Sequence, residues 1–322
     1  MRKKLNIYLI LLGTLLLLKC SAISKLSQQQ AIKGPEFSPY DGLKTSVAVL
    51  DFENYTDQGG EKFGSAVSDM IVSLLIRSGR FNVIERQRIQ QVFEEQALGQ
   101  TGAVTEETAP RVGQLLGVQS LIIGNIAEAS QKTGSQEFTN DDDDKKDFWA
   151  FALKATVGHV KFHYRVVNTT TGEIVLADDV SATEIRPGFG IKTKDFDFED
   201  MFELDQTILG IATRKAVNKI AKTIVKNSNK IEWQGKIVRV KEDSLVYFTP
   251  GKRSGVKIGN MFKVFGKSSD FSEEDTELME LVEKGIVKVI DFVGGNAAIA
   301  ITVEGGSFET GDRLKLYKIE LQ

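Results

Sequence analysis

Few residues in this chain could carry out chemistry, and their spacing does not favour a catalytic centre. The two histidines, His159 and His163, would share one face of a strand with Lys161 between them. A zinc site on such a pair needs carboxylate or thiolate ligands nearby, and the sequence places none beside it. The acidic run at residues 141–144 lacks the alternating ligands and central glycine of a calcium loop. No glycine-rich phosphate loop follows a strand and opens a helix. We therefore predict a non-enzymatic protein with no catalytic residue, metal or cofactor.

Cys20 is the one side chain whose position predicts a modification. It is the only cysteine, and it follows a basic start and an apolar run from Leu5 to Leu18. That order is typical of a secretory signal peptide, and the apolar run is shorter than the roughly 20 residues of a membrane-spanning helix. Bacterial lipoproteins carry a diacylglyceryl thioether on a cysteine at this point, so we predict lipidation of Cys20. Lys19 departs from the usual small residue, which leaves an ordinary signal peptide or an uncleaved anchor as alternatives.

Composition is consistent with an exported, folded protein. Hydrophobic residues make up 41% of the chain, and about 300 residues remain after the leader, enough for two domains. Loss of Arg2, Lys3, Lys4 and Lys19 changes the net charge from −3 to about −7, so the charge gives no reason to expect nucleic acid. With Cys20 lipidated, no disulfide can form and stability must come from packing.

The next part of the chain predicts a flexible tether and then an α/β layer. Residues 21–43 are rich in serine, glutamine and proline and lack a sustained period, as in a spacer. Buried strands are expected at residues 45–52, 81–84 and 118–126 because these are short apolar runs. Helices are expected from Phe63 to Gly79, from Glu85, and from Thr105 to Gly117.

A hairpin and a long helix should complete this first domain, which we place at residues 44–230. Residues 159–168 and 173–183 are extended segments joined by a Thr-Thr-Thr-Gly turn at 169–172. Apolar residues at helical spacing predict one helix over residues 204–227.

Residues 231–322 have the short, glycine-separated runs of a small β-domain. The stretch from Gly259 to Phe265 is repeated in pattern from Gly311 to Tyr317, and each is a tight turn followed by an alternating strand. The predicted fold class is therefore α/β, a mixed sheet with flanking helices, plus a small C-terminal β-barrel-like domain.

Several strings resemble a known family when taken together in their order. They are VAVLDF at 47–52, GRFNVIER at 79–86, LLGV at 115–118 and RVVNTTTGEI at 165–174. The combination resembles the curli production assembly/transport component (CsgG) family over roughly residues 44–228. The C-terminal part looks like the small β-domain of flagellar-assembly proteins of the FlgT type. The family-signature residues are interpreted as structural, and they are Asp51, Glu85, Arg86, Asn168, Gly172 and Glu173.

The resemblance implies two membrane hairpins in a shared ring barrel, near residues 128–160 and 184–206. Residues 149–158 have the alternation that a lipid-facing strand needs. One side carries Trp149, Phe151, Leu153, Ala155 and Val157, and the other carries Ala150, Ala152, Lys154, Thr156 and Gly158. The other segments carry many charges, which cost about 2–4 kcal/mol each on a lipid face. A tethered module without a pore therefore remains an alternative. The family's channel constriction would fall at Asn54 and Tyr55, whereas Phe63 is better placed in the core.

The resemblance also predicts the setting in which the protein acts. It implies a lipoprotein of the outer membrane, facing the periplasm, that forms a homo-oligomer and takes part in secretion or assembly of exported subunits. Its partners would be exported protein subunits or envelope assembly partners. The alternative is a monomeric docking or regulatory lipoprotein, and oligomeric state would distinguish the two.

Overall fold

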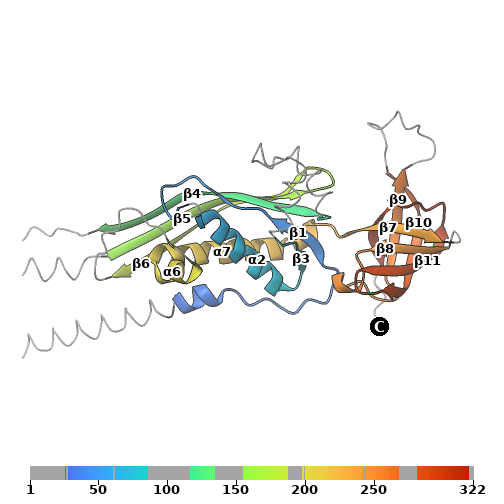
Figure 1. The fold of residues 1–322 in the computed structure, drawn as a ribbon, viewed down its shortest axis with the longest axis horizontal. Helices are drawn as coiled ribbons and strands as arrows, with labels where there is room; N and C mark the ends of the chain where they lie inside the picture. Colours follow the sequence, from blue (N-terminus) through green and yellow to red (C-terminus); the bar gives the residue numbers. More distant parts are fainter. Residues whose placement is uncertain are drawn as a thin grey trace, which may run out of the picture.

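A mixed sheet covered on one face by helices is followed by a closed β-barrel in the computed structural model (Figure 1). The structure describes residues 26, 28–60, 62–85, 117–134, 155–187, 198, 200–241, 244–267 and 281–318. The predicted fold class, a mixed α/β layer with a small C-terminal barrel, is confirmed. The expected helices from Glu85 and from Thr105 lie outside the described residues apart from Glu85 and Gly117.

The sheet combines a parallel half and an antiparallel half. Its strands are β1 (Thr45–Val49), β2 (Glu53–Asn54), β3 (Phe81–Val83), β4 (Ser120–Gly134), β5 (Ala155–Asn168) and β6 (Ile174–Pro187). The order is β3-β1-β4-β5-β6, with β2 pairing on β4 beyond the end of β1. Strand β1 is parallel to β3 and β4, whereas β4, β5 and β6 are antiparallel neighbours.

The strand expected at residues 45–52 is broken into two by a helix contact. The Ser68 hydroxyl accepts a hydrogen bond from the Phe52 amide at 3.0 Å and donates one to the Leu50 carbonyl at 2.9 Å. The Leu50 amide still donates to the Ile122 carbonyl of β4 at 2.9 Å, but the Leu50 carbonyl and the Phe52 amide bind Ser68. Strand pairing resumes as β2, which adds to the edge of β4.

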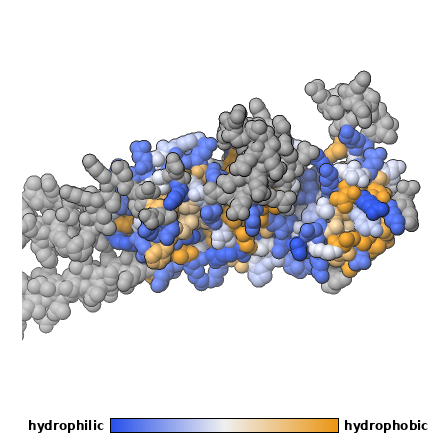
Figure 2. Space-filling view, in the orientation of Figure 1, coloured by the Kyte–Doolittle hydropathy of each residue, from blue (hydrophilic) through white to orange (hydrophobic). Residues whose placement is uncertain are grey.

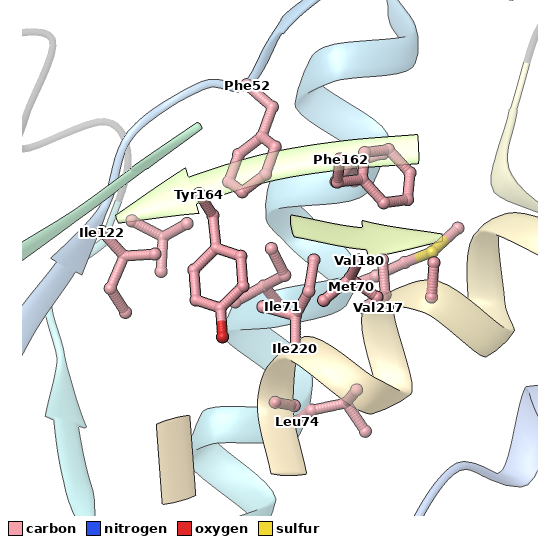
Figure 3. Close-up of a cluster of buried hydrophobic side chains, with 14 of the residues drawn as sticks. Phe52, Met70, Ile71, Leu74, Ile122, Phe162, Tyr164, Val180, Val217 and Ile220 are labelled. Atoms are coloured by element: carbon pink, nitrogen blue, oxygen red, sulfur yellow. The ribbon is translucent and has the colours of Figure 1, made fainter. Parts of the chain in front are cut away.

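Two long helices bury one face of the sheet. Helix α2 (Lys62–Ser78) ends before Gly79, whose φ of 69° lies in the left-handed region, as predicted for this C-terminus. Helix α7 (Ile208–Lys226) packs on β5 and β6. Figure 3 shows the core between helices and sheet, where Phe162 and Tyr164 of β5 meet Ile71 of α2 and Ile220 of α7.

The single helix expected over residues 204–227 is two helices. Helix α6 (Met201–Gln206) ends at Thr207, and the Thr207 hydroxyl accepts a hydrogen bond from the Gly210 amide at 2.8 Å to begin α7. A Cβ on Gly210 would overlap the Leu204 carbonyl, so the two helices meet at close range. A capping threonine inside an apolar pattern is the cause of the break.

The predicted tether is not a free spacer from residue 28 onward. Residues 28–33 are helical, and residues 34–44 run along the helices to the barrel (Figure 1). We call residues 28–44 the strap. Its contacts include Gln28 Nε2 to the Asp205 carbonyl at 2.9 Å and Asn218 Nδ2 to the Ala31 carbonyl at 2.9 Å. Composition alone could not reveal these long-range bonds.

Six strands close the C-terminal barrel. They are β7 (Gln234–Lys241), β8 (Leu245–Thr249), β9 (Met261–Lys267), β10 (Leu281–Val293), β11 (Ala297–Gly305) and β12 (Arg313–Lys318), in the order β10-β11-β8-β7-β12-β9. The two sequence repeats become the adjacent strands β9 and β12, with Leu314 opposite Val264. Their leading glycines, Gly259 and Gly311, have φ values of 90° and 105°.

The barrel is attached to the sheet by backbone contacts as well as side chains. The Lys44 amide donates to the Ser254 carbonyl at 2.8 Å, and Asn82 Nδ2 donates to Ser254 Oγ at 2.7 Å. Leu43 of the strap belongs to the barrel core. The chain itself crosses from the sheet's core at Ile231 to the barrel core at Trp233. Within the part of the chain that the structure describes, no helix is long and apolar enough to cross a bilayer.

At this junction, position 255 should tolerate substitution of its glycine poorly. Its φ is 80°, and a Cβ there would collide with the carbonyl oxygen of Gly42 in the strap. We expect Gly255→Ala to lower the unfolding free energy for two reasons. An alanine in the left-handed region costs about 1–2 kcal/mol, and its Cβ would also overlap the Gly42 carbonyl oxygen. Gly294→Ala is the control, since Gly294 also has a positive φ of 60° but no atom near its Cβ position. Equal urea midpoints for the two variants would contradict the close approach of Gly255 to the Gly42 carbonyl oxygen.

Tyr164 should make stability fall at alkaline pH. Burial and the nearby Asp178 carboxylate raise its pKa to about 12. The unfolded chain releases this proton near pH 10, so the unfolding free energy should fall as pH rises from about 10 to about 12, by up to about 1.4 kcal/mol per pH unit. Urea unfolding of Tyr164→Phe should show a shallower pH slope than the parent, and Tyr247→Phe, in the barrel, is the control. An unchanged slope in Tyr164→Phe would contradict the assignment.

Candidate functional site

The loop after β2 is held in shape by Asn54, one of the two predicted constriction residues. Asn54 Nδ2 donates to the carbonyl oxygens of Gln58 at 2.9 Å and Gly60 at 3.1 Å. Its Oδ1 accepts from the Thr56 amide at 3.1 Å and the Thr56 hydroxyl at 2.8 Å. Asn54 therefore organises the loop from within, and its amide is not available to a ligand.

Tyr55, the second predicted residue, is the side chain that this loop presents to solvent. It is 67% exposed, while its amide donates to the Ile126 carbonyl of β4 at 3.2 Å. Its hydroxyl donates to the Glu53 carboxylate, and this bond raises the pKa of the Tyr55 hydroxyl, with a smaller opposing effect from Arg165. Tyr55 is thus held against β4 by its backbone and against Glu53 by its hydroxyl.

Phe63 is a core residue, as the sequence indicated. It is fully buried, and its ring packs edge-to-face on Phe198 with centroids 6.1 Å apart. The aromatic side chain offered to a partner is therefore Tyr55 alone among the three residues considered.

The face of β5 that is turned away from α2 and α7 carries a row of polar side chains. Even-numbered residues such as Val160 and Phe162 are buried under the helices, so the odd-numbered residues point the other way. We call this row, with its neighbours on β4 and β6, the polar face; it comprises Glu128, His159, Lys161, His163, Arg165, Asp179 and Thr183. Register places Lys161 beside Glu128, and His163 beside Asp179.

Each histidine of the polar face has its own carboxylate. His159 Nε2 lies 3.5 Å from Glu128, and His159 Nδ1 lies 2.9 Å from the Thr183 hydroxyl. His163 Nδ1 lies 3.8 Å from Asp179. Within the described ranges no group of three or more His, Cys, Asp or Glu side chains could hold a metal ion. The geometry is that of a surface of cross-strand charge pairs.

The turn residues of the family signature form one hydrogen-bonded unit. Asn168 Oδ1 accepts from the Thr170 amide at 2.7 Å, and the Asn168 amide donates to the Glu173 carbonyl at 2.8 Å. Gly172 has a φ of 75°, and its amide donates to the Asn168 carbonyl. These residues shape the β5–β6 turn.

The other signature residues are dispersed. Asp51 is exposed at the end of β1, and Glu85 is exposed after β3. Arg86 and Cys20 lie outside the described residues, so their expected roles remain predictions.

The flanks of the two expected membrane hairpins differ from each other. Strands β4 and β5 stay paired as far as Gly134 and Ala155, so the first insert continues the sheet, although residues 135–154 lie outside the description. The second expected hairpin, 184–206, is wrong at its C-terminal end, because residues 201–206 form α6. Residues 188–197 are not among those described.

In β5, Thr156 and Gly158 face the helices, since Thr156 is 2% exposed and a Cβ on Gly158 would collide with Ile208 of α7. Helix packing, which hydrophobic alternation does not reveal, fills that side. The charge pairs of the polar face were also missed, since they depend on the register between strands.

Comparison with known proteins gives one family match and several distant relatives. Residues 38–246 match the family model described as curli production assembly/transport component CsgG. A Neisseria meningitidis serogroup B protein named "putative lipoprotein" is 23% identical over 202 residues, covering 58% of this chain and 78% of its own.

Solved structures with similar folds are more distant. A hypothetical protein of Chlamydia trachomatis has a TM-score of 0.35 at 17% identity, covering 57% of this chain and 97% of its own. A lipoprotein of Neisseria meningitidis has a TM-score of 0.32 at 15% identity, covering 55% and 99%. A PelC dodecamer subunit of Paraburkholderia phytofirmans has a TM-score of 0.29 at 15% identity, covering 60% and 93%.

Asn54→Ala should destabilise the protein more than removal of the Tyr55 hydroxyl. Asn54 makes four hydrogen bonds within its loop. Leaving those partners unpaired should cost about 1–3 kcal/mol in urea unfolding. Tyr55→Phe, which loses one exposed bond, should stay within about 0.5 kcal/mol of the parent. A reversal of this order would show that Asn54 does not organise the loop.

Proposed function

Because the chain belongs to the curli production assembly/transport component (CsgG) family, we propose that it is a lipid-anchored envelope protein that assembles or secretes exported subunits. The observation that carries this proposal is the family match over residues 38–246. The leader-like start of the sequence and Cys20 support an exported, lipidated form. The proposed location is the outer membrane, with the protein facing the periplasm as a homo-oligomer.

The polar face and Tyr55 are the proposed contact surface for exported subunits or assembly partners. Glu53 of the Tyr55 loop pairs with Asn125, which pairs in turn with His163 on the polar face. Tyr55 therefore stands at the edge of the charge-paired row and not on a separate surface. Tyrosine offers a large contact area at low entropic cost, and surrounding charges favour selectivity over raw affinity. An unfolded or extended cargo that lies along the strand direction would contact both Tyr55 and the polar face.

A second candidate is a docking module without a pore. The observation that favours it is the structure of the residues next to the two inserts. Residues 201–206 form helix α6 where a strand was expected, and Thr156 and Gly158 of β5 are buried on the helix side. Such a module would bring the same polar face to another envelope complex as a monomer or dimer. The two candidates share the anchor and differ in assembly.

The size of the detergent-extracted, full-length protein distinguishes these candidates. We expect light scattering to give one homogeneous species of many subunits, and electron microscopy to show a ring. The matched variant is Lys161→Glu, which places a carboxylate beside Glu128 on the polar face. If this face joins subunits, the like charges should reduce ring formation, and if it binds cargo, rings should persist.

A monomer or dimer that remains the largest species at high protein concentration would exclude the assembly proposal. That result would establish the docking module as the remaining candidate. Intact mass measures the lipid separately. The Cys20→Ser variant is the control, because it lacks the sulfur that a thioether needs.

A further inference from the structure

Large apolar side chains are exposed at the end of the molecule opposite the barrel. Phe202 of α6 is 72% exposed, Ile185 of β6 59%, and Leu26, just before the strap, 56%. Phe202 has the highest exposed fraction among the large apolar side chains of the described residues. We call these three residues the apolar end. Figure 1 places α6, the end of β6 and the start of the strap at this same end, and Figure 2 shows hydrophobic surface there.

Helix α6 is held in a way that fixes Phe202 outward. The Asp200 carboxylate accepts from the Glu203 amide at 2.9 Å and caps the helix. Asp205 makes two hydrogen bonds to Arg214 of α7, at 2.7 and 2.9 Å, and Leu204 is fully buried. With Leu204 and Asp205 turned inward, the Phe202 side chain lies on the remaining side of the short helix. Its exposure therefore follows from a docked helix.

The strap begins against α6, eight residues after the predicted lipidation site at Cys20. Gln28 Nε2 donates to the carbonyl oxygen of Asp205, so the strap starts against this helix. Cys20 precedes Leu26 by six residues, and an extended chain of that length spans at most about 20 Å. A lipid on Cys20 would therefore hold the bilayer surface within about 20 Å of Leu26, at the end of the molecule where α6 lies. The barrel, at the other end of the strap, would point away from the bilayer (Figure 1).

We infer that Leu26, Ile185 and Phe202 contact the surface of the bilayer that holds the lipid on Cys20, a conclusion that rests on the proposed lipid anchor. An exposed aromatic ring at such a distance suits the boundary between headgroups and acyl chains. The contact gives the protein one orientation, because a lipid on a short linker alone would leave the long axis free to tilt. The occupant of the apolar end is thus lipid, and the barrel is presented to the aqueous compartment.

Depth-dependent fluorescence quenching tests this contact in the full-length, lipidated protein. Phe202→Trp and Ile258→Trp are each reconstituted in phosphatidylethanolamine–phosphatidylglycerol vesicles with and without brominated acyl chains. Ile258 is 50% exposed near the barrel and serves as the control position. After subtraction of the parent protein, brominated lipid should reduce the emission added at position 202 about twofold and leave position 258 unchanged.

Equal emission at position 202 with and without brominated lipid would overturn the inference. Cross-linking between copies through position 202 without quenching would assign the apolar end to a subunit contact, which also overturns it. Intact mass on the same sample reports whether Cys20 carries a lipid. A lipid-free mass would refute the proposed anchor, and quenching would still decide the bilayer contact separately.

Discussion

The structure depends on the burial of one face of β5. Val160, Phe162, Tyr164 and Val166 point into the core formed with α2 and α7. Because side chains of a strand alternate, this burial directs His159, Lys161, His163 and Arg165 outward as one row. A one-residue shift in register would exchange the two sets and bury four basic or imidazole groups. The polar face is therefore specified by the core on its opposite side.

The same burial explains how distant parts of the chain meet. Helix α7 covers β5 and β6, its Asn218 side chain binds the strap at Ala31, and its Arg214 pairs with Asp205 to hold α6. Arg214 and Asp205 side chains are only 18% and 12% exposed, so loss of one partner would leave the other charge poorly solvated. From this helix the strap continues to Leu43 in the barrel core. The strap therefore contacts both the helices and the barrel, in addition to the link through Asn82 and Ser254.

Local signals in the sequence were sufficient for much of the fold. Helix α2 could be predicted because its apolar spacing ends at a glycine, and the β5–β6 turn because Asn168 and Gly172 satisfy local backbone demands. The repeated glycine turns predicted two barrel strands, though not that β9 and β12 would be neighbours. The break at Thr207 was missed because a polar cap is masked by the continuous apolar pattern around it. The strap was missed because its bonds join residues such as Gln28 and Asp205, which composition cannot connect.

Of the candidate site, the sequence predicted Tyr55 as a residue to consider, but not the role of its neighbour. Asn54 and Tyr55 are adjacent and polar, yet one is turned into its loop and the other out into solvent. That difference comes from the pairing of β2 with β4, which sets the direction of each side chain. The histidines could be placed on one face from spacing alone. Their carboxylate partners required the registers of β4 and β6.

The route of the strap has a mechanical consequence. Its bonds from Gln28, Ala31 and Lys33 to the helices lie one after another along its length. A force applied to the N-terminus along the strap would strain these bonds together in shear. A force applied at right angles would peel them away one at a time, starting at Gln28. The protein should therefore resist lengthwise tension better than sideways displacement, so its response to a pull on the N-terminal segment depends on direction.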